Sequence, residues 1–135
     1  MEYIVEARSK QKKAFVEHML PKMIKQLGLT KSKKVLLVRV ANECDEGNDG
    51  QTMPIPAIDS IIVVLKPKPL DLLGITLAHE MVHVKQIARG TLKSFNGVNY
   101  WNGKRVHHKT KYLNKPWEIE AFSKQELIFR RALEN

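Results

Sequence analysis

The chain of 135 residues contains one cysteine, Cys44, and no long apolar run. A single cysteine cannot form a disulfide within the chain, which excludes a small secreted scaffold held together by disulfides. No stretch reaches the roughly 18 to 20 apolar residues that a membrane-spanning helix needs, and residues 1–10 lack the apolar core of a secretory signal. These absences predict a cytoplasmic protein with no membrane association.

Acidic residues are scarce relative to basic ones, with 14 Asp and Glu against 23 Lys and Arg and a formal net charge of +9. Such a charge attracts nucleic acid or an acidic protein surface without specifying either. The basic residues are scattered along the chain, and no known nucleic-acid-binding motif occurs among them. A merely solvated basic surface is therefore the simpler interpretation, and a functional basic face is the alternative.

Apolar spacing and capping residues predict three helices, over residues 9–27, 70–89 and 116–133. Pro21 should kink or interrupt the first helix, and Gly28 should end it. On the second helix, one set of apolar residues forms the predicted buried stripe: Leu70, Leu73, Leu77, Met81, Val84 and Ala88. Ala78 is expected to face solvent on the same helix.

Two short β-branched runs, Val35–Val40 and residues 61–65, predict strands. Between them, residues 41–57 are rich in Asn, Asp, Gly and Pro and predict a long mobile loop, whose acidic residues lack the spacing of an EF-hand calcium site. Asn102 and Gly103 predict a hairpin within residues 99–108. Together with the three helices, these elements predict a single α+β domain over residues 1–135.

The second predicted helix carries the sequence His79-Glu80-Met81-Val82-His83, an H-E-x-x-H motif. Residues four apart lie about one turn from each other, so the imidazoles of His79 and His83 can bind one zinc ion. Glu80 is rotated away from them, near enough to take a proton from a metal-bound water as general base. The alternative is that both histidines are ordinary surface residues without a metal.

A catalytic zinc needs a third protein ligand and one open position. Glu118 lies on the predicted inward face of the last helix and is the preferred ligand. A carboxylate in the first turn of a helix is also favourable without any metal, so this residue type alone does not decide its role. Glu120, on the outward face, and the pair His107 and His108 remain alternatives.

An H-E-x-x-H helix followed by a later glutamate resembles the gluzincin branch of the zincins. Residues 77–86, a hairpin and then Pro-Trp-Glu-x-Glu-Ala resemble small metallopeptidases of phages and bacteria, and the resemblance covers residues 70–122. It implies a minimal zincin-like domain that hydrolyses peptide or protein substrates with Zn²⁺. It also implies that the strand over residues 61–65 lies along the cleft, where an edge strand can pair with an extended substrate; an ordinary core strand is the alternative.

The sequence departs from better-known relatives in the surroundings of the metal. Several gluzincins have Asp four residues after the ligand glutamate, whereas this chain has Phe122, so support for the ligand histidines must come from elsewhere. Gln86, one turn beyond His83, is a candidate for that support or an ordinary surface residue. Candidates for stabilising an oxyanion are Tyr100, Tyr112 and His108.

A function of another class is also consistent with the sequence. SprT-type proteases, which act on DNA-bound proteins, use a third histidine as ligand, and the net charge of +9 suits a protein recruited to DNA. The chain is then a non-catalytic or DNA-recruited zincin-like module that uses its basic surface to bind nucleic acid or an acidic protein partner.

Overall fold

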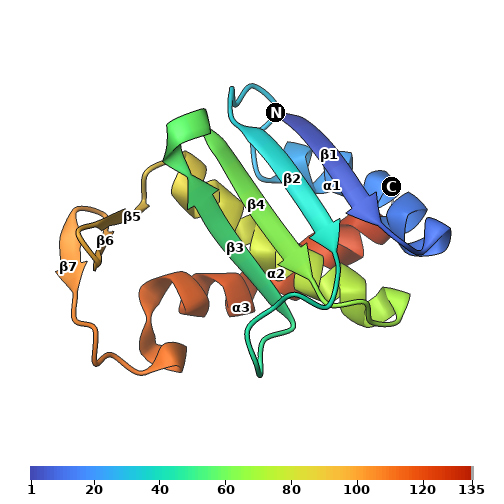
Figure 1. Cartoon of the computed structure of the whole chain (residues 1–135). Helices are drawn as coiled ribbons and strands as arrows, with labels where there is room; N and C mark the ends of the chain where they lie inside the picture. Colours follow the sequence, from blue (N-terminus) through green and yellow to red (C-terminus); the bar gives the residue numbers. More distant parts are fainter. Residues whose placement is uncertain (135) are drawn as a thin grey trace.

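The computed structural model describes residues 1–134, so Asn135, the last residue of the predicted domain, lies outside it. The strands are β1 (Glu2–Ala7), β2 (Val35–Val40), β3 (Gly50–Ile55), β4 (Ser60–Leu65), β5 (Leu92–Phe95), β6 (Val98–Trp101) and β7 (Lys104–Val106). The helices are α1 (Lys10–Gln26), α2 (Leu70–Ala88) and α3 (Pro116–Glu134), with short 3-10 helices η1 (Pro56–Ile58) and η2 (Tyr112–Asn114). These elements confirm the α+β class (Figure 1).

The larger sheet has four strands in the order β1-β2-β4-β3, and the helices cover one of its faces (Figure 1). Strands β1, β2 and β4 run parallel, while β3 pairs with β4 antiparallel. Residues of β2 alternate between buried and partly buried, as expected when one face of a sheet packs on the core. The core therefore lies between this sheet and the helices, with Leu36, Met23 and Leu77 fully buried in it.

Helix α1 begins after Ser9, whose side chain accepts a hydrogen bond from the backbone N–H of Lys12. The helix runs through Pro21 without a break, so the prediction of an interruption at this residue was wrong. Leu20 and Met23 are buried on either side of Pro21, and their packing offsets the backbone hydrogen bond that proline removes. The helix ends as predicted before Gly28, which has a φ of +68°.

The segment predicted as a long loop, residues 41–57, contains strand β3 and the start of η1, and the prediction missed both. The edge strand beside α2 is therefore β3, whereas β4 lies inside the sheet between β2 and β3. The prediction that residues 61–65 form an edge strand was wrong, and the alternative of a core strand holds. Strand β1 at the opposite edge was also not predicted.

Strand β3 is hard to predict from the local sequence, because it contains Gly50 and Pro54 and both residue types are rare inside strands. The backbone N–H of Lys66 donates to Asp49 O at 2.9 Å, so Asp49 and Lys66 form a hydrogen-bonded pair. In an antiparallel ladder such pairs alternate with pairs that are not hydrogen-bonded, so only every second residue of β3 bonds to β4. Gly50, Thr52 and Pro54 consequently direct their backbone groups away from β4 and towards the open edge. Pro54 has no N–H to offer there, so its presence removes no hydrogen bond from the sheet.

Helix α2 is buried on more sides than the sequence predicts. Its apolar stripe packs on the core as expected, but Ala78 is also fully buried, which corrects the prediction that it faces solvent. The cause is α3, which lies along this side of α2, with Gly74 against the ring of Phe129. A Cβ atom added at Gly74 would lie 2.1 Å from Phe129 Cε1, so glycine sets how closely the two helices approach.

The predicted hairpin forms between β6 and β7, with positive φ at Asn102 and Gly103 as a type I′ turn requires. Strand β5 adds to β6, so that the hairpin belongs to a separate three-stranded sheet in the order β5-β6-β7. This sheet lies at one end of the molecule, away from β1 (Figure 1). Within residues 1–134, no helix has both the length and the apolar character that crossing a bilayer requires.

Substitution of Gly74 tests the close approach of α2 and α3. We expect Gly74→Val to lower the free energy of unfolding by about 2 kcal/mol or more, because the added atoms overlap the Phe129 ring. Urea denaturation measures the change. The double variant Gly74→Val with Phe129→Ala should recover part of the loss relative to the sum of the single changes. Strict additivity of the two changes would contradict the proposed overlap.

Candidate metal centre

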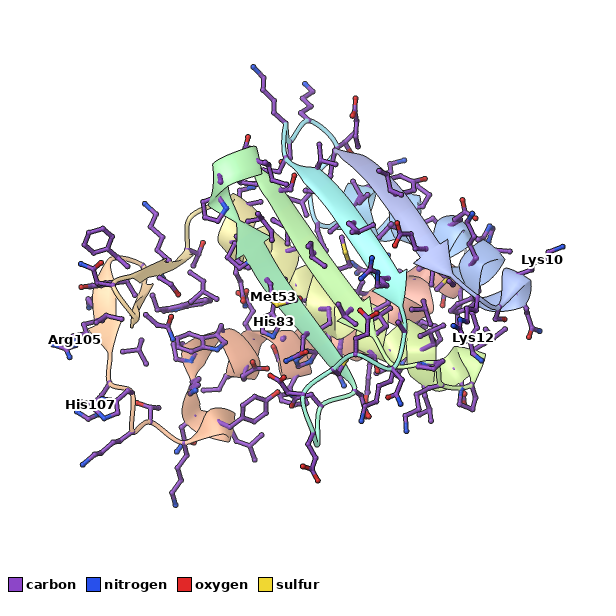
Figure 2. All side chains as sticks on the ribbon, in the orientation of Figure 1. Lys10, Lys12, Met53, His83, Arg105 and His107 are labelled. Carbon is purple, nitrogen blue, oxygen red and sulfur yellow. The ribbon has the colours of Figure 1, made fainter. Side chains whose placement is uncertain are left out.

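His79 and His83 lie one turn apart in the middle of α2, on the side of the helix that faces α3 and the edge strand β3. Both are buried, each with a relative exposure of 7%. Their rings are 4.9 Å apart between centroids and nearly perpendicular, at 84°. Figure 2 shows His83 beneath β3 near the middle of the molecule. The i, i+4 spacing thus places two imidazoles on one face of a rigid element, as the sequence predicts.

Glu118 reaches the same place from the first turn of α3, where its backbone N–H donates to Lys115 O at 3.0 Å. Its Oε1 lies 2.9 Å from His79 Nε2 and 3.2 Å from His83 Nε2. Two ligand atoms bound tetrahedrally at about 2.1 Å from one zinc ion are roughly 3.3 Å apart. The structure therefore brings the three predicted ligand residues together at separations that fit a single small cation.

Glu80 is also close, since ligand-type atoms of His79, Glu80 and His83 all lie within 4.8 Å of one another. Two carboxylates are thus available as third ligand. Glu118 fits better, because one of its oxygens contacts both imidazoles. Glu80 is instead directed towards the sheet, where its Oε1 accepts a hydrogen bond from Thr52 Oγ1 at 2.7 Å.

The other predicted alternatives for the third ligand lie elsewhere. Glu120 is partly buried and accepts hydrogen bonds from Gln86 Nε2 at 3.0 Å and from Lys124 Nζ at 3.3 Å, and it has no hydrogen bond to either histidine. His107 and His108 are exposed and stack on each other, with ring centroids 4.5 Å apart. Both line a small separate hollow beside β7 and not the site between α2 and α3.

Two glutamines hold the predicted ligand histidines in position. His79 Nδ1 donates to Gln125 Oε1 at 2.8 Å, and His83 Nδ1 donates to Gln86 Oε1 at the same distance. A proton on Nδ1 leaves Nε2 of each ring free to bind a metal. Gln86 was a candidate for this support from the sequence, whereas Gln125 was not. Phe122 packs its ring edge-on against His79 with centroids 4.5 Å apart.

Gln86 is almost fully buried, at 1% exposure, and links the two helices that carry the site. Its Nε2 donates to Trp117 O and to Glu120 Oε1, each at 3.0 Å. The Gln86 amide thus connects the Glu120 carboxylate to His83 through two hydrogen bonds, which strengthen each other. Glu120 supports the site from outside and contributes no ligand atom, and Gln86 is the supporting residue that the sequence offered as one of two interpretations.

Glu80 lies between α2 and the edge strand, buried to 5% exposure. Burial raises the pKa of its carboxyl above the usual range, although the nearby His83 and the hydrogen bond from Thr52 oppose the shift. None of the described residues donates a hydrogen bond to its other oxygen, Oε2. Gly50 faces this carboxylate, and a Cβ atom at that position would lie 3.1 Å from Oε2.

Glu118 and His83 stabilise each other's charged form. Burial acts to raise the pKa of Glu118, but hydrogen bonds from His79 and His83 outweigh it and hold the value at about 2. Burial likewise acts to lower the pKa of His83, but its hydrogen bonds to Glu118 and Gln86 and the charges of Glu80 and Glu118 together outweigh burial, so that this pKa is raised. In the metal-free protein, Glu118 therefore stays ionised and favours protonation of the imidazole, which a metal would replace.

Tyr112, in η2, lies at the opening of the site, and its hydroxyl donates to Glu118 Oε1 at 3.1 Å. Burial and the neighbouring Glu118 carboxylate raise the pKa of this phenol, which keeps it protonated. The residue borders two adjoining hollows of about 550 and 240 Å³ between β3 and the helices. Both hollows also reach Gly50 and Glu80, so they form one cleft that passes over the predicted reacting groups.

Two supporting residues, Thr52 and Gln125, were not predicted from the sequence. Thr52 falls in the segment predicted as a loop, and Gln125 lies seven residues beyond Glu118 on α3. The only available signal was that Gln125 shares the inward face of the last helix with Glu118. Comparison with known proteins adds no relative: no family model, no curated protein and no solved structure matches the chain.

The ion pairs of the metal-free centre predict how stability depends on pH. A carboxyl whose pKa is lowered on folding stabilises the protein above its unfolded pKa of about 4.3, and this stabilisation is lost as the pH falls through its folded value. A histidine with a raised pKa stabilises below about 6.5, and this is lost as the pH rises through its folded value.

Glu118→Gln should therefore lower the free energy of unfolding most between about pH 4.5 and 6.5, by about 2 kcal/mol, and least near pH 2. Urea denaturation of both proteins in the presence of EDTA measures the difference. Glu126→Gln, an exposed change on the same helix, is the matched control. An effect of Glu118→Gln that stays constant from pH 2 to pH 8 would rule out the charge pairing.

Proposed function

We propose that the protein is a zinc-dependent metallopeptidase with a zincin-type site. The observation that carries this proposal is the contact of one Glu118 oxygen with the Nε2 atoms of both His79 and His83. Glu80 lies next to this triad, and an open cleft passes over all four residues. Two imidazoles and a carboxylate, with a second carboxylate alongside, are the ligand and base set of zinc hydrolases.

The donor set favours zinc over harder cations. Imidazole nitrogen suits zinc and other transition metals, whereas magnesium and calcium prefer sites made of oxygen atoms. His79, His83 and Glu118 would hold the ion through Nε2, Nε2 and Oε1. When bound, it supplies a Lewis acid that polarises a substrate carbonyl and lowers the pKa of water towards neutrality.

Glu80 acts as the general base in this proposal. Its Oε1 is held by Thr52, while Oε2 remains available to accept a proton from the water that attacks the peptide carbonyl. A raised pKa suits this role, because a base whose pKa is closer to neutrality accepts the proton more readily. The same carboxyl can then return the proton to the leaving amine.

Tyr112 is the best placed of the three candidates for stabilising the oxyanion. Tyr100 belongs to the β5-β6-β7 sheet, and His108 stacks on its sequence neighbour outside the cleft. Tyr112 alone among them borders both hollows, and its hydroxyl is 3.1 Å from the proposed metal ligand Glu118. Because its phenol stays protonated, it can donate a hydrogen bond to negative charge that develops on the carbonyl oxygen.

The open edge of β3 is the proposed binding line for an extended substrate peptide. Gly50 and Thr52 direct their backbone N–H and C=O groups outward, next to Glu80. Pairing of a peptide with an edge strand would carry its backbone along the cleft and past the metal centre. Pro54, two residues further, offers only a carbonyl group, so the pairing is weaker at that end.

Glu80→Gln tests the base. Because the amide cannot accept the proton, we expect kcat for a peptide substrate to fall by a factor of about 10² to 10⁴ while zinc binding persists. Peptide hydrolysis and elemental analysis of the same preparation measure the two quantities. Glu126→Gln, the same change at an exposed site on α3, should leave both unaltered. Hydrolysis at the normal rate by Glu80→Gln would remove Glu80 as the base.

Thr52→Val tests the positioning of that base by the edge strand. We expect kcat to fall about tenfold with KM nearly unchanged, because the lost hydrogen bond frees the Glu80 carboxylate without altering the cleft. Thr52→Ser keeps the hydroxyl and should restore kcat to within about twofold. A loss of kcat shared equally by the valine and serine variants would indicate a packing role for Thr52.

A further inference from the structure

Residues 90–115, here named the basic arm, form a stretch of the chain without any acidic residue. The arm contains strands β5, β6 and β7 and the segment leading through η2 to α3. Six of its residues are cationic, namely Lys93, Lys104, Arg105, Lys109, Lys111 and Lys115, and it has no Asp or Glu. All of these except Lys115 are exposed to solvent.

The cations of the arm lack anionic partners. Some basic side chains elsewhere pair with carboxylates, as Lys34 does with Asp59 and Arg39 with Glu6. Among the described residues, none of the six arm cations is within ion-pair distance of an acidic group. Lys115 lies over the ring of Trp117, with its Nζ 5.7 Å from the ring centroid. The charges of the other five are screened by solvent and salt, and a polyanion would replace the counterions they hold.

The strand register places cationic and aromatic residues on the same face of the small sheet. Lys93 pairs with Tyr100, and Tyr100 pairs with Arg105, so the three side chains form a row across the strands. Phe95 lies two residues from Lys93 and so shares this face. Phe95 is 68% exposed, more than Tyr112 and Phe122 at 51% and 45%.

This face lies at the outer end of the molecule. Figure 1 shows the β5-β6-β7 sheet projecting beyond the end of β3, and Figure 2 shows Arg105 and His107 at the outer margin there. Lys10, at the start of α1, lies at the opposite end (Figure 2). The arm nevertheless adjoins the cleft, because Leu92 of β5 lines the smaller hollow together with Glu118.

We propose that the basic arm binds single-stranded nucleic acid. Lys93 and Arg105 would contact phosphates, while Phe95 and Tyr100 offer rings on which bases stack. Phe95 is exposed and Tyr100 is half-buried. Aromatic rings between cations suit unpaired bases, whose π-faces are hidden in a duplex. An acidic peptide would use the cations and gain little from the rings. The proposal does not depend on peptide hydrolysis, and its tests need neither metal nor protease substrate.

Removal of two cations tests the contact with phosphates. The experiment measures the fluorescence anisotropy of a labelled 20-residue oligothymidylate with the full chain over a range of salt. We expect Lys93→Ala with Arg105→Ala to weaken binding about tenfold at low salt and to reduce the slope of log K against log salt by about 1.4. The matched control, Lys10→Ala with Lys13→Ala in α1, should stay within about twofold of the native chain.

Removal of one ring tests stacking separately from charge. Phe95→Ala should weaken binding of the oligonucleotide at least about fivefold without altering the salt slope. Ile58→Ala is the matched control, because Ile58 is also 68% exposed but lies in η1, outside the arm. All six positions of the arm variants and their controls are exposed to solvent, and circular dichroism verifies that each variant keeps its fold.

Three outcomes would overturn the proposal. A duplex of the same sequence length that binds as tightly as the single strand would exclude recognition of unpaired bases. Polyglutamate that displaces the oligonucleotide at equal charge concentration, together with unaltered binding by Phe95→Ala, would indicate a general site for acidic polymers. An equal loss of affinity in the Lys10 and Lys13 control would show that only net charge matters.

Discussion

The contact between one carboxylate oxygen of Glu118 and the imidazoles of both His79 and His83 is the interaction on which the site depends. It joins the middle of α2 to the first turn of α3, two elements that the sequence separates by the whole β5-β6-β7 sheet. Gln86 reinforces the junction from one side and Gln125 from the other. Buried polar groups in this number are stable only because almost every donor and acceptor has a partner.

Helical spacing made much of the site predictable. His79, Glu80 and His83 are set by local geometry, and Glu118 shares a face of α3 with Ala121, which is fully buried. Both inferences need only the 3.6-residue period, which holds wherever a helix forms. The ends of the helices were predicted to within a residue or two for the same reason, since Ser9, Gly28 and Gly90 act on the adjacent turn.

Features that depend on pairing across the chain were not predictable. Strand β3 combines Gly50, Thr52 and Pro54, a composition typical of loops, and only its pairing with β4 makes it a strand. Thr52 could therefore not be connected with Glu80. The prediction that Ala78 faces solvent was wrong for the same reason. Helical periodicity identifies the faces of one helix, but it does not show that α3 covers a second face of α2. The hydrogen-bond partners of the histidines likewise arise from the packing of two helices.

The narrow passage between Gly50 and Glu80 has a consequence for how this fold can vary. A methyl group at position 50 would lie 2.8 Å from Thr76 Cγ2 and 3.0 Å from Glu80 Cγ. Because glycine has no side chain, β3 can approach α2 this closely. Substitutions at neighbouring residues such as Gln51 or Met53 change the rim of the cleft without altering the distance between Gly50 and Glu80. Substitutions at the rim can therefore change the shape of the cleft, while the spacing between β3 and α2 at its centre stays constant.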